Sequence, residues 1–175
     1  MSRSGPIALL VAAFLLAGCA NYSSFPPLEG QESSADATQA PVPEVIATAI
    51  EWCVAREDYR VQEQPVDFAL PAGMPAETHD AVSTQLVEDG FPRGLDASES
   101  TNPIRVRSVR LFGLKAMVDL SVPRSNGFEQ LVTLELRSYP FQSWYVVAAN
   151  RWRFNEDQLR RTQTELSQAS TEPAP

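Results

Sequence analysis

The chain has 175 residues, and its 14 basic and 22 acidic side chains give a formal net charge of −8 at pH 7. This length is enough for one domain with a buried core, plus tails. An acidic chain repels nucleic acid and anionic lipid, so the overall charge argues against both as electrostatic partners; the simplest reason for the acidity is solubility.

The first residues have the parts of a secretory signal. Arg3 is the only charged residue before position 19, and residues 7–16 are all apolar. This run is shorter than the roughly 20 residues that a transmembrane helix needs. It ends in Leu16-Ala17-Gly18-Cys19, which resembles the lipobox of bacterial lipoproteins. The resemblance implies that residues 1–18 are a signal peptide cleaved between Gly18 and Cys19, and that Cys19 receives a diacylglyceryl thioether and an acylated amine. An ordinary secretory signal and an uncleaved anchor are the alternatives.

Ala20 bears on the choice of membrane. In enterobacteria an aspartate after the modified cysteine implies retention in the inner membrane, so Ala20 predicts an outer-membrane protein that faces the periplasm in a diderm host. In a monoderm host the same anchor would lie in the cytoplasmic membrane. The resemblance therefore predicts an envelope protein whose first partner is a membrane, held through the lipid.

The sequence has two cysteines, and lipidation would use one of them. Cys53 is then the remaining thiol, so a mature lipidated chain cannot form an internal disulfide. Cys53 lies within an apolar helical stripe, which predicts a buried structural thiol; a reactive thiol would need an electropositive, partly exposed setting.

Composition divides the rest of the chain into a domain and two tails. Residues 20–42 are rich in Ser, Ala, Gln, Pro and Glu, and such a segment cannot bury enough surface to offset the entropy of ordering. We therefore expect residues 19–42 to be the lipidated Cys19 and a disordered tether. Residues 167–175 have the same character and are expected to be a disordered tail. Residues 43–166 remain as a single domain.

Helices are expected in the first half of this domain. Pro43 suits a first helical turn, and the first helix is expected over residues 43–59 because apolar side chains follow at helical spacing: Val45, Ile46, Ala49, Ile50, Cys53 and Val54. Residues 66–70 lie between two prolines and predict an edge strand or a loop. A second helix is expected over residues 75–88, with Gly90 as its stop, followed by a polar loop over residues 89–103.

From residue 104 the apolar pattern changes to a period of two, which predicts strands. They are expected over residues 104–112, 116–122, 128–137 and 144–152, and the alternation slips once near Ser108, which predicts a bulge. Short turns between them, with the hairpin signal Asn126-Gly127, favour an antiparallel meander. A final helix is expected over residues 156–166, capped by Asn155. The fold class is therefore α+β: N-terminal helices packed on a curved antiparallel four-strand meander, with a C-terminal helix.

The order of helices followed by a meander that contains Ser143-Trp144-Tyr145-Val146-Val147 looks like the nuclear-transport-factor-like (SnoaL-type, cystatin-like) α+β superfamily. This resemblance covers residues 43–154 and is one of pattern and order. It implies a pocket between a concave sheet face and the helices. Some members of that superfamily are enzymes and many bind or assemble, so the fold by itself gives no function.

The usual catalytic sets are missing from the sequence. His79 is the one histidine, and beside an apolar helix face it is more often a packed or capping residue than a base. No His/Cys group has zinc spacing, and there is no glycine-rich phosphate loop. Asp89, Asp96 and Glu99 lie in one expected loop, but their spacing matches no calcium loop. We expect no metal, no cofactor and no enzymatic activity.

Four side chains are the candidates for a pocket. Asp119 and Glu135 lie on neighbouring expected strands, opposite the apolar positions. Facing a cavity, they would form a general acid/base pair or bind a cation. Facing water, they would pair with Lys115, Arg137, Arg151 or Arg153, and this second interpretation is favoured. Trp144 and Trp152 share one face of the last expected strand. There they would belong to the core or hold an apolar ligand.

Two functional hypotheses follow. The first is a non-catalytic lipoprotein of the cell envelope that presents a small α+β domain for interaction with envelope proteins or with itself. The alternative is a pocketed binder or hydrolase-like domain for a small apolar or lipidic ligand, which predicts a cavity lined by tryptophan and an isolated carboxylate.

Overall fold

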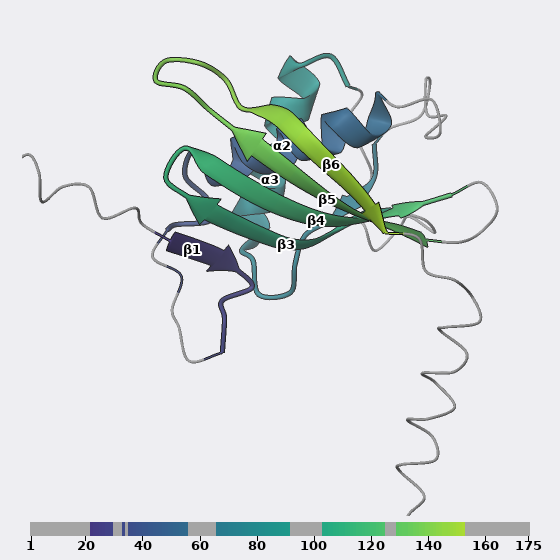
Figure 1. Cartoon of the computed structure of the whole chain (residues 1–175), viewed down its shortest axis with the longest axis horizontal. Coiled ribbons are helices and arrows are strands. Elements are labelled where there is room, and N and C mark those ends of the chain that lie inside the picture. The colour runs from purple at the N-terminus through teal and green to yellow at the C-terminus, as the bar shows by residue number, and fades with distance from the viewer. Residues whose placement is uncertain are drawn as a thin grey trace, which may run out of the picture.

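Two helices pack on one face of a six-stranded sheet (Figure 1). The computed structural model of the chain describes residues 22–29, 33, 35–55, 66–91, 103–124 and 129–152. The α+β class expected from the sequence is confirmed, with helices of 13 residues each against a sheet that is antiparallel except for one short pairing. Among the described residues no helix lies on the other face of the sheet, and we refer to it as the helix-free face.

The sheet is larger than the four strands expected. Its order is β1-β3-β4-β5-β6, and β3 (Ile104–Phe112), β4 (Lys115–Pro123), β5 (Glu129–Arg137) and β6 (Tyr145–Trp152) pair antiparallel in chain order. Two short strands share the outer edge of β3. β1 (Tyr22–Phe25) pairs antiparallel with the second half of β3, and β2 (Phe68–Ala69) pairs parallel with its first residues.

The apolar residues of these strands point to the helices and form the core. On β4 they are Ala116, Val118, Leu120 and Val122, all buried as expected. On β3 the expected slip in alternation is confirmed, because the register with β4 shifts between Val106 and Ser108. The shift puts Arg107 and Ser108 on the exposed side in succession, so that Val106 and Val109 both stay in the core.

The helices supply the other half of the core. α2 (Val42–Val54) buries the expected stripe, with Val45, Ile46, Ala49 and Ile50 fully inaccessible to solvent. It begins with a proline in its first turn and Glu44 near the positive end of the helix dipole. α3 (Ala76–Glu88) buries Val82 and Leu86 and stops as expected before Gly90, whose φ of 92° suits glycine.

The expectation of an unstructured tether must be corrected for β1. Residues 22–25 lie within the range 19–42, yet they pair with β3 from Tyr22↔Phe112 to Phe25↔Val109. Ser23, Ser24 and Phe25 are buried there, and Ala37 is buried further along. The physical reason is that β3 offers a free edge, so a short polar segment satisfies its backbone groups by pairing and needs little apolar surface of its own.

A second correction concerns the faces of β6. The register between β5 and β6 shifts so that Glu135 pairs with Ala148 and Leu136 with Val146, which leaves Val147 as an extra residue. The alternation therefore reverses at Val147. Trp144 is buried on the helix side at 8% exposure, whereas Trp152 is 56% exposed on the helix-free face. The prediction that the two tryptophans share a face is wrong for this reason.

Several expectations fall outside the described residues. They are the signal peptide with Gly18 and Cys19, the end of the first helix beyond residue 55, most of the loop over 89–103, the C-terminal helix over 156–166 and the tail over 167–175.

Candidate functional site

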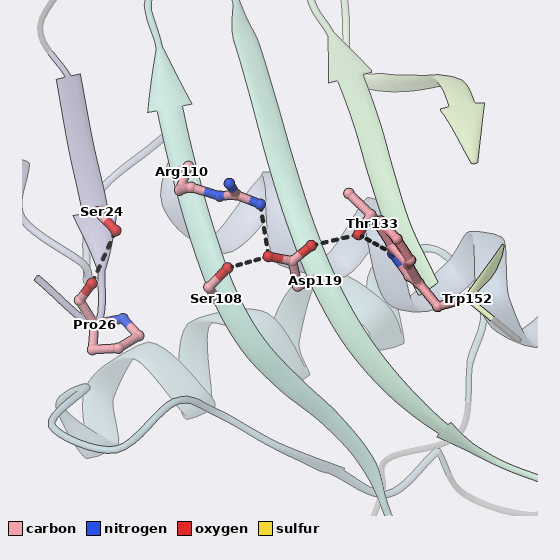
Figure 2. A network of polar contacts seen from close by, with 7 residues as sticks. All are labelled: Ser24, Pro26, Ser108, Arg110, Asp119, Thr133 and Trp152. Atoms are coloured by element: carbon pink, nitrogen blue, oxygen red, sulfur yellow. Dashed lines mark hydrogen bonds and ion pairs between the residues drawn. The ribbon is translucent and has the colours of Figure 1, made fainter. Parts of the chain in front are cut away.

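Asp119 is the centre of a polar network on the helix-free face (Figure 2). One of its carboxylate oxygens accepts hydrogen bonds from Ser108 Oγ and from the Arg110 guanidinium, each at 2.6 Å. The other accepts one from Thr133 Oγ1, also at 2.6 Å. Since these donors lie on β3 and β5, with Asp119 on β4 between them, the carboxylate ties three neighbouring strands together.

The network extends to the last strand through Trp152. The indole Nε1 of Trp152 donates to Thr133 Oγ1 at 3.1 Å, so one chain of contacts runs from β3 to β6 (Figure 2). The side chains of Arg110 and Asp119 are 31% and 32% exposed. The network thus lies on the surface of the sheet and not in a cavity.

A second cluster surrounds Glu129 at the start of β5. Its carboxylate lies 3.5 Å from Arg105 and 3.3 Å from Arg107, and it accepts a short hydrogen bond from Ser121 Oγ. The Ser121 hydrogen bond and the two guanidinium groups hold the pKa of Glu129 below its usual range. The Glu129 carboxylate is therefore compensated within the sheet, and one of the two guanidinium charges is in excess.

The candidate pair Asp119 and Glu135 does not form an acid/base site. In the register of β4 and β5, Asp119 is opposite Thr133 and Glu135 is opposite Met117. Glu135 instead pairs with Arg137 on its own strand at 3.1 Å. Each carboxylate thus has a guanidinium partner on the helix-free face. This arrangement stabilises the sheet by a modest amount.

A shallow cleft lies on the other side of the sheet, between α2 and the ends of β4, β5 and β6. Its lining mixes apolar side chains with two cations: Trp52, Cys53, Val122, Arg124, Gln130, Val132 and Arg151. The four pocket candidates taken from the sequence are not among these residues. Burial raises the pKa of the Cys53 thiol to about 12, so the thiol is neutral at physiological pH and fits the structural role expected for it.

Two further titratable side chains, His79 and Glu51, have structural surroundings. The ring of His79 stacks on that of Phe68 with 4.3 Å between centroids, which joins α3 to β2. Burial raises the pKa of Glu51 on α2 to about 7, and the nearby Asp89 carboxyl after α3 adds to this effect. Among the described residues, no group of three His, Cys, Asp or Glu side chains could hold a metal ion.

The arginines of β3 are the partners that sequence reasoning missed. We expected the carboxylates to pair with Lys115, Arg137, Arg151 or Arg153, and Arg137 does pair with Glu135. Asp119, however, pairs with Arg110, and Glu129 with Arg105 and Arg107. The sequence does carry a signal for these partners, because the three arginines occupy the polar positions of β3 once the bulge near Ser108 is taken into account.

Comparison with family models, with curated proteins and with solved structures finds no match for this chain. In the part of the chain that the structure describes, neither helix has the length and apolar composition needed to cross a membrane.

Proposed function

We propose that the protein is a membrane-anchored lipoprotein of the cell envelope. It presents its α+β domain for interaction with envelope proteins or with copies of itself, and it has no catalytic role. The observation that carries the proposal is the sequence Leu16-Ala17-Gly18-Cys19 at the end of an apolar run. It is supported by the chemistry of the domain, where Asp119 and Glu135 are ion-paired on an open face and the Cys53 thiol is buried.

The edge strand β6 supports a role in protein interaction. Within the described residues, no strand pairs with its outer edge. Seven of its eight residues are exposed, with Val146 the exception, and it contains no proline and one charged residue, Arg151. An exposed edge of this kind offers a row of free backbone donors and acceptors to another strand. Partner binding or self-assembly by strand addition at β6 is therefore part of the proposal.

The two cysteines make a matched test of the anchor. Cells that express the protein are fed an alkyne-tagged fatty acid, and the label on the purified chain is measured. The proposal predicts a labelled chain in the membrane fraction, loss of label in Cys19→Ser, and full label in Cys53→Ser. Label that persists in Cys19→Ser, or an unlabelled parent chain, would contradict the anchor.

The interaction surface is tested by site-specific photo-cross-linking in the same cells. A photoreactive residue at Ala149 on β6 should give discrete cross-linked products, whereas the same residue at Thr84 on α3 should not. If neither position gives products and the purified domain is a monomer, the interaction role fails.

The cleft beside α2 supports a second candidate function, the binding of a small amphipathic anion. Its lining places Trp52 and Val132 close to Arg124 and Arg151, an arrangement that fits an apolar tail and an acidic head. Titration with laurate should then raise the melting temperature of the domain, and Arg151→Gln should remove this effect. A melting temperature that laurate leaves unchanged would exclude the candidate.

A further inference from the structure

One end of the sheet collects exposed aromatic side chains. We call it the turn end: the start of β1, the β3–β4 turn at residues 112–115 and the β5–β6 loop at residues 138–144. These segments lie together at the left of Figure 1. The described residues include nine exposed large apolar side chains. Four of them belong to the turn end and a fifth is the first residue of β6, directly after the loop: Phe112, Leu114, Tyr139, Phe141 and Tyr145.

The strand register arranges part of this set in a single row. Direct pairing runs Tyr22↔Phe112, Phe112↔Lys115, Lys115↔Arg137 and Arg137↔Tyr145. Residues that pair directly point to the same side of a sheet, so the row crosses five strands on the helix-free face, over about 19 Å at the usual strand spacing. Aromatic rings stand at both ends and two cations stand in the middle, which is the composition found where proteins meet the polar boundary of a bilayer.

The loop beyond the row holds one ring fully in solvent. Phe141 is 107% exposed and has a φ of 66°, which is unfavourable for a residue with a side chain. Hydrogen bonds within the loop keep this shape: Gln142 N–H donates to Tyr139 C=O at 2.9 Å, and Ser138 Oγ donates to Gln142 C=O at 2.8 Å. The exposed Phe141 ring contributes nothing to the core, so packing within the domain does not explain its position.

Charge at the turn end is opposite to that of the whole chain. The protein has a net charge of −8, yet residues 112–115 and 137–145 contain Lys115 and Arg137 and no acidic residue. Lys115 and Arg137 are direct neighbours across two strands. Glu135 offsets the Arg137 charge at 3.1 Å, and Lys115 stays exposed beside this pair. The repulsion of anionic lipid expected from the overall charge therefore does not apply here.

Chain length brings the same end to the membrane. Two residues lie between Cys19 and Tyr22, so the anchor and the first residue of β1 are three residue steps and at most about 11 Å apart. We propose that the turn end rests on the lipid bilayer, with Leu114 and Phe141 inserted among the headgroups and Lys115 against lipid phosphates. This orientation rests on the proposed lipid anchor, because the anchor selects the membrane; the apolar and basic surface is a separate observation.

The test uses residues 19–175 with Cys19→Ser, which we call the soluble chain. It contains every described element, lacks the lipid, and so measures the surface independently of the anchor. Partitioning is measured by co-sedimentation with vesicles of phosphatidylcholine and phosphatidylglycerol. Leu114→Ser with Phe141→Ser should weaken partitioning at least about tenfold, as two partly inserted side chains would. The control, Leu28→Ser with Val87→Ser, changes two other exposed apolar side chains away from the turn end and should have no effect.

A charge variant tests the electrostatic contribution of Lys115 to membrane binding. Lys115→Gln should weaken partitioning to the anionic vesicles about fivefold and leave partitioning to pure phosphatidylcholine unchanged. Circular dichroism on each variant confirms the fold.

Equal partitioning of the soluble chain and the Leu114/Phe141 variant, whether strong or absent, would overturn the orientation. Lipidation of Cys19 would not be affected by this result, because the labelling experiment tests it separately. Self-association in the absence of lipid that the same two substitutions abolish would assign the surface to a second copy and would also overturn it.

Discussion

Replacing Asp119 tests whether the polar network is a structural tie of the sheet. Asp119→Ala removes an acceptor that receives three hydrogen bonds at 2.6 Å from Ser108, Arg110 and Thr133. A hydrogen bond to a charged group contributes about 1.5–3 kcal/mol when buried. The carboxylate is 32% exposed, so water can replace part of each bond, and we expect a loss of about 2 kcal/mol in total.

The assay is equilibrium unfolding of the soluble chain in urea, followed by circular dichroism. Asp119→Asn keeps one carboxylate-like oxygen and loses the charge, so it should lose about half as much free energy of unfolding as Asp119→Ala. Asp80→Ala removes an exposed carboxylate on α3 and should change the free energy of unfolding by less than about 0.5 kcal/mol. If Asp119→Ala left the free energy of unfolding unchanged or raised it, the structural role of Asp119 would be refuted. Such a result is typical of residues that are kept for function at a cost in stability.

Three further predictions concern individual side chains. The pKa of Glu51 is raised to about 7, so its protonated form favours the folded state and the free energy of unfolding should fall as pH rises from about 4.5 to 7. Glu51→Gln should remove this fall and stabilise the chain by about 1 kcal/mol at about pH 8, after allowance for solvent screening, with little effect near pH 4; urea unfolding at both pH values measures it, and an unchanged slope would contradict it. The pKa of the Cys53 thiol is raised to about 12 by burial, so iodoacetamide should leave the native soluble chain unmodified and alkylate it in urea, and modification of the native chain would show that the thiol is accessible. Gly90 has a φ of 92° after α3, so Gly90→Ala should destabilise the chain by about 1 kcal/mol in thermal unfolding, and an unchanged melting temperature would argue against this end of the helix.

Elements with a strong internal pattern could be predicted from the sequence. β4 and β5 alternate without interruption, and α2 has an apolar stripe over three turns, so their faces follow from periodicity alone. The slip near Ser108 was visible because apolar residues flank it on both sides. β1 and β2 have no such pattern, since their burial comes from the edge of β3, which is more than thirty residues further along the chain.

The surroundings of the candidate residues were harder to predict because they depend on register. The bulge at Val147 moves Trp152 to the face opposite Trp144, and nothing in the local sequence marks it. Periodicity places Asp119 opposite the apolar face of its strand, but its ion-pair partner Arg110 lies across the strand pair, nine residues away in the chain. A one-residue shift between strands changes every such pairing, so composition cannot identify the partners.

The correction at β1 also changes the account of the anchor. A tether of more than twenty residues would let the domain move freely above the membrane. With Tyr22 already in the sheet, the anchor would instead hold one end of the domain close to the lipid. The proposed anchor and the turn end would then meet the membrane at the same end of the domain.

The proposed lipid anchor is tested by the intact mass of the chain extracted from membranes of its host. The account predicts a chain that begins at Cys19 and carries the added mass of a diacylglyceryl group, with or without a third acyl chain on the amine. A chain that retains residues 1–18, or one that begins at Cys19 without added lipid, would contradict it.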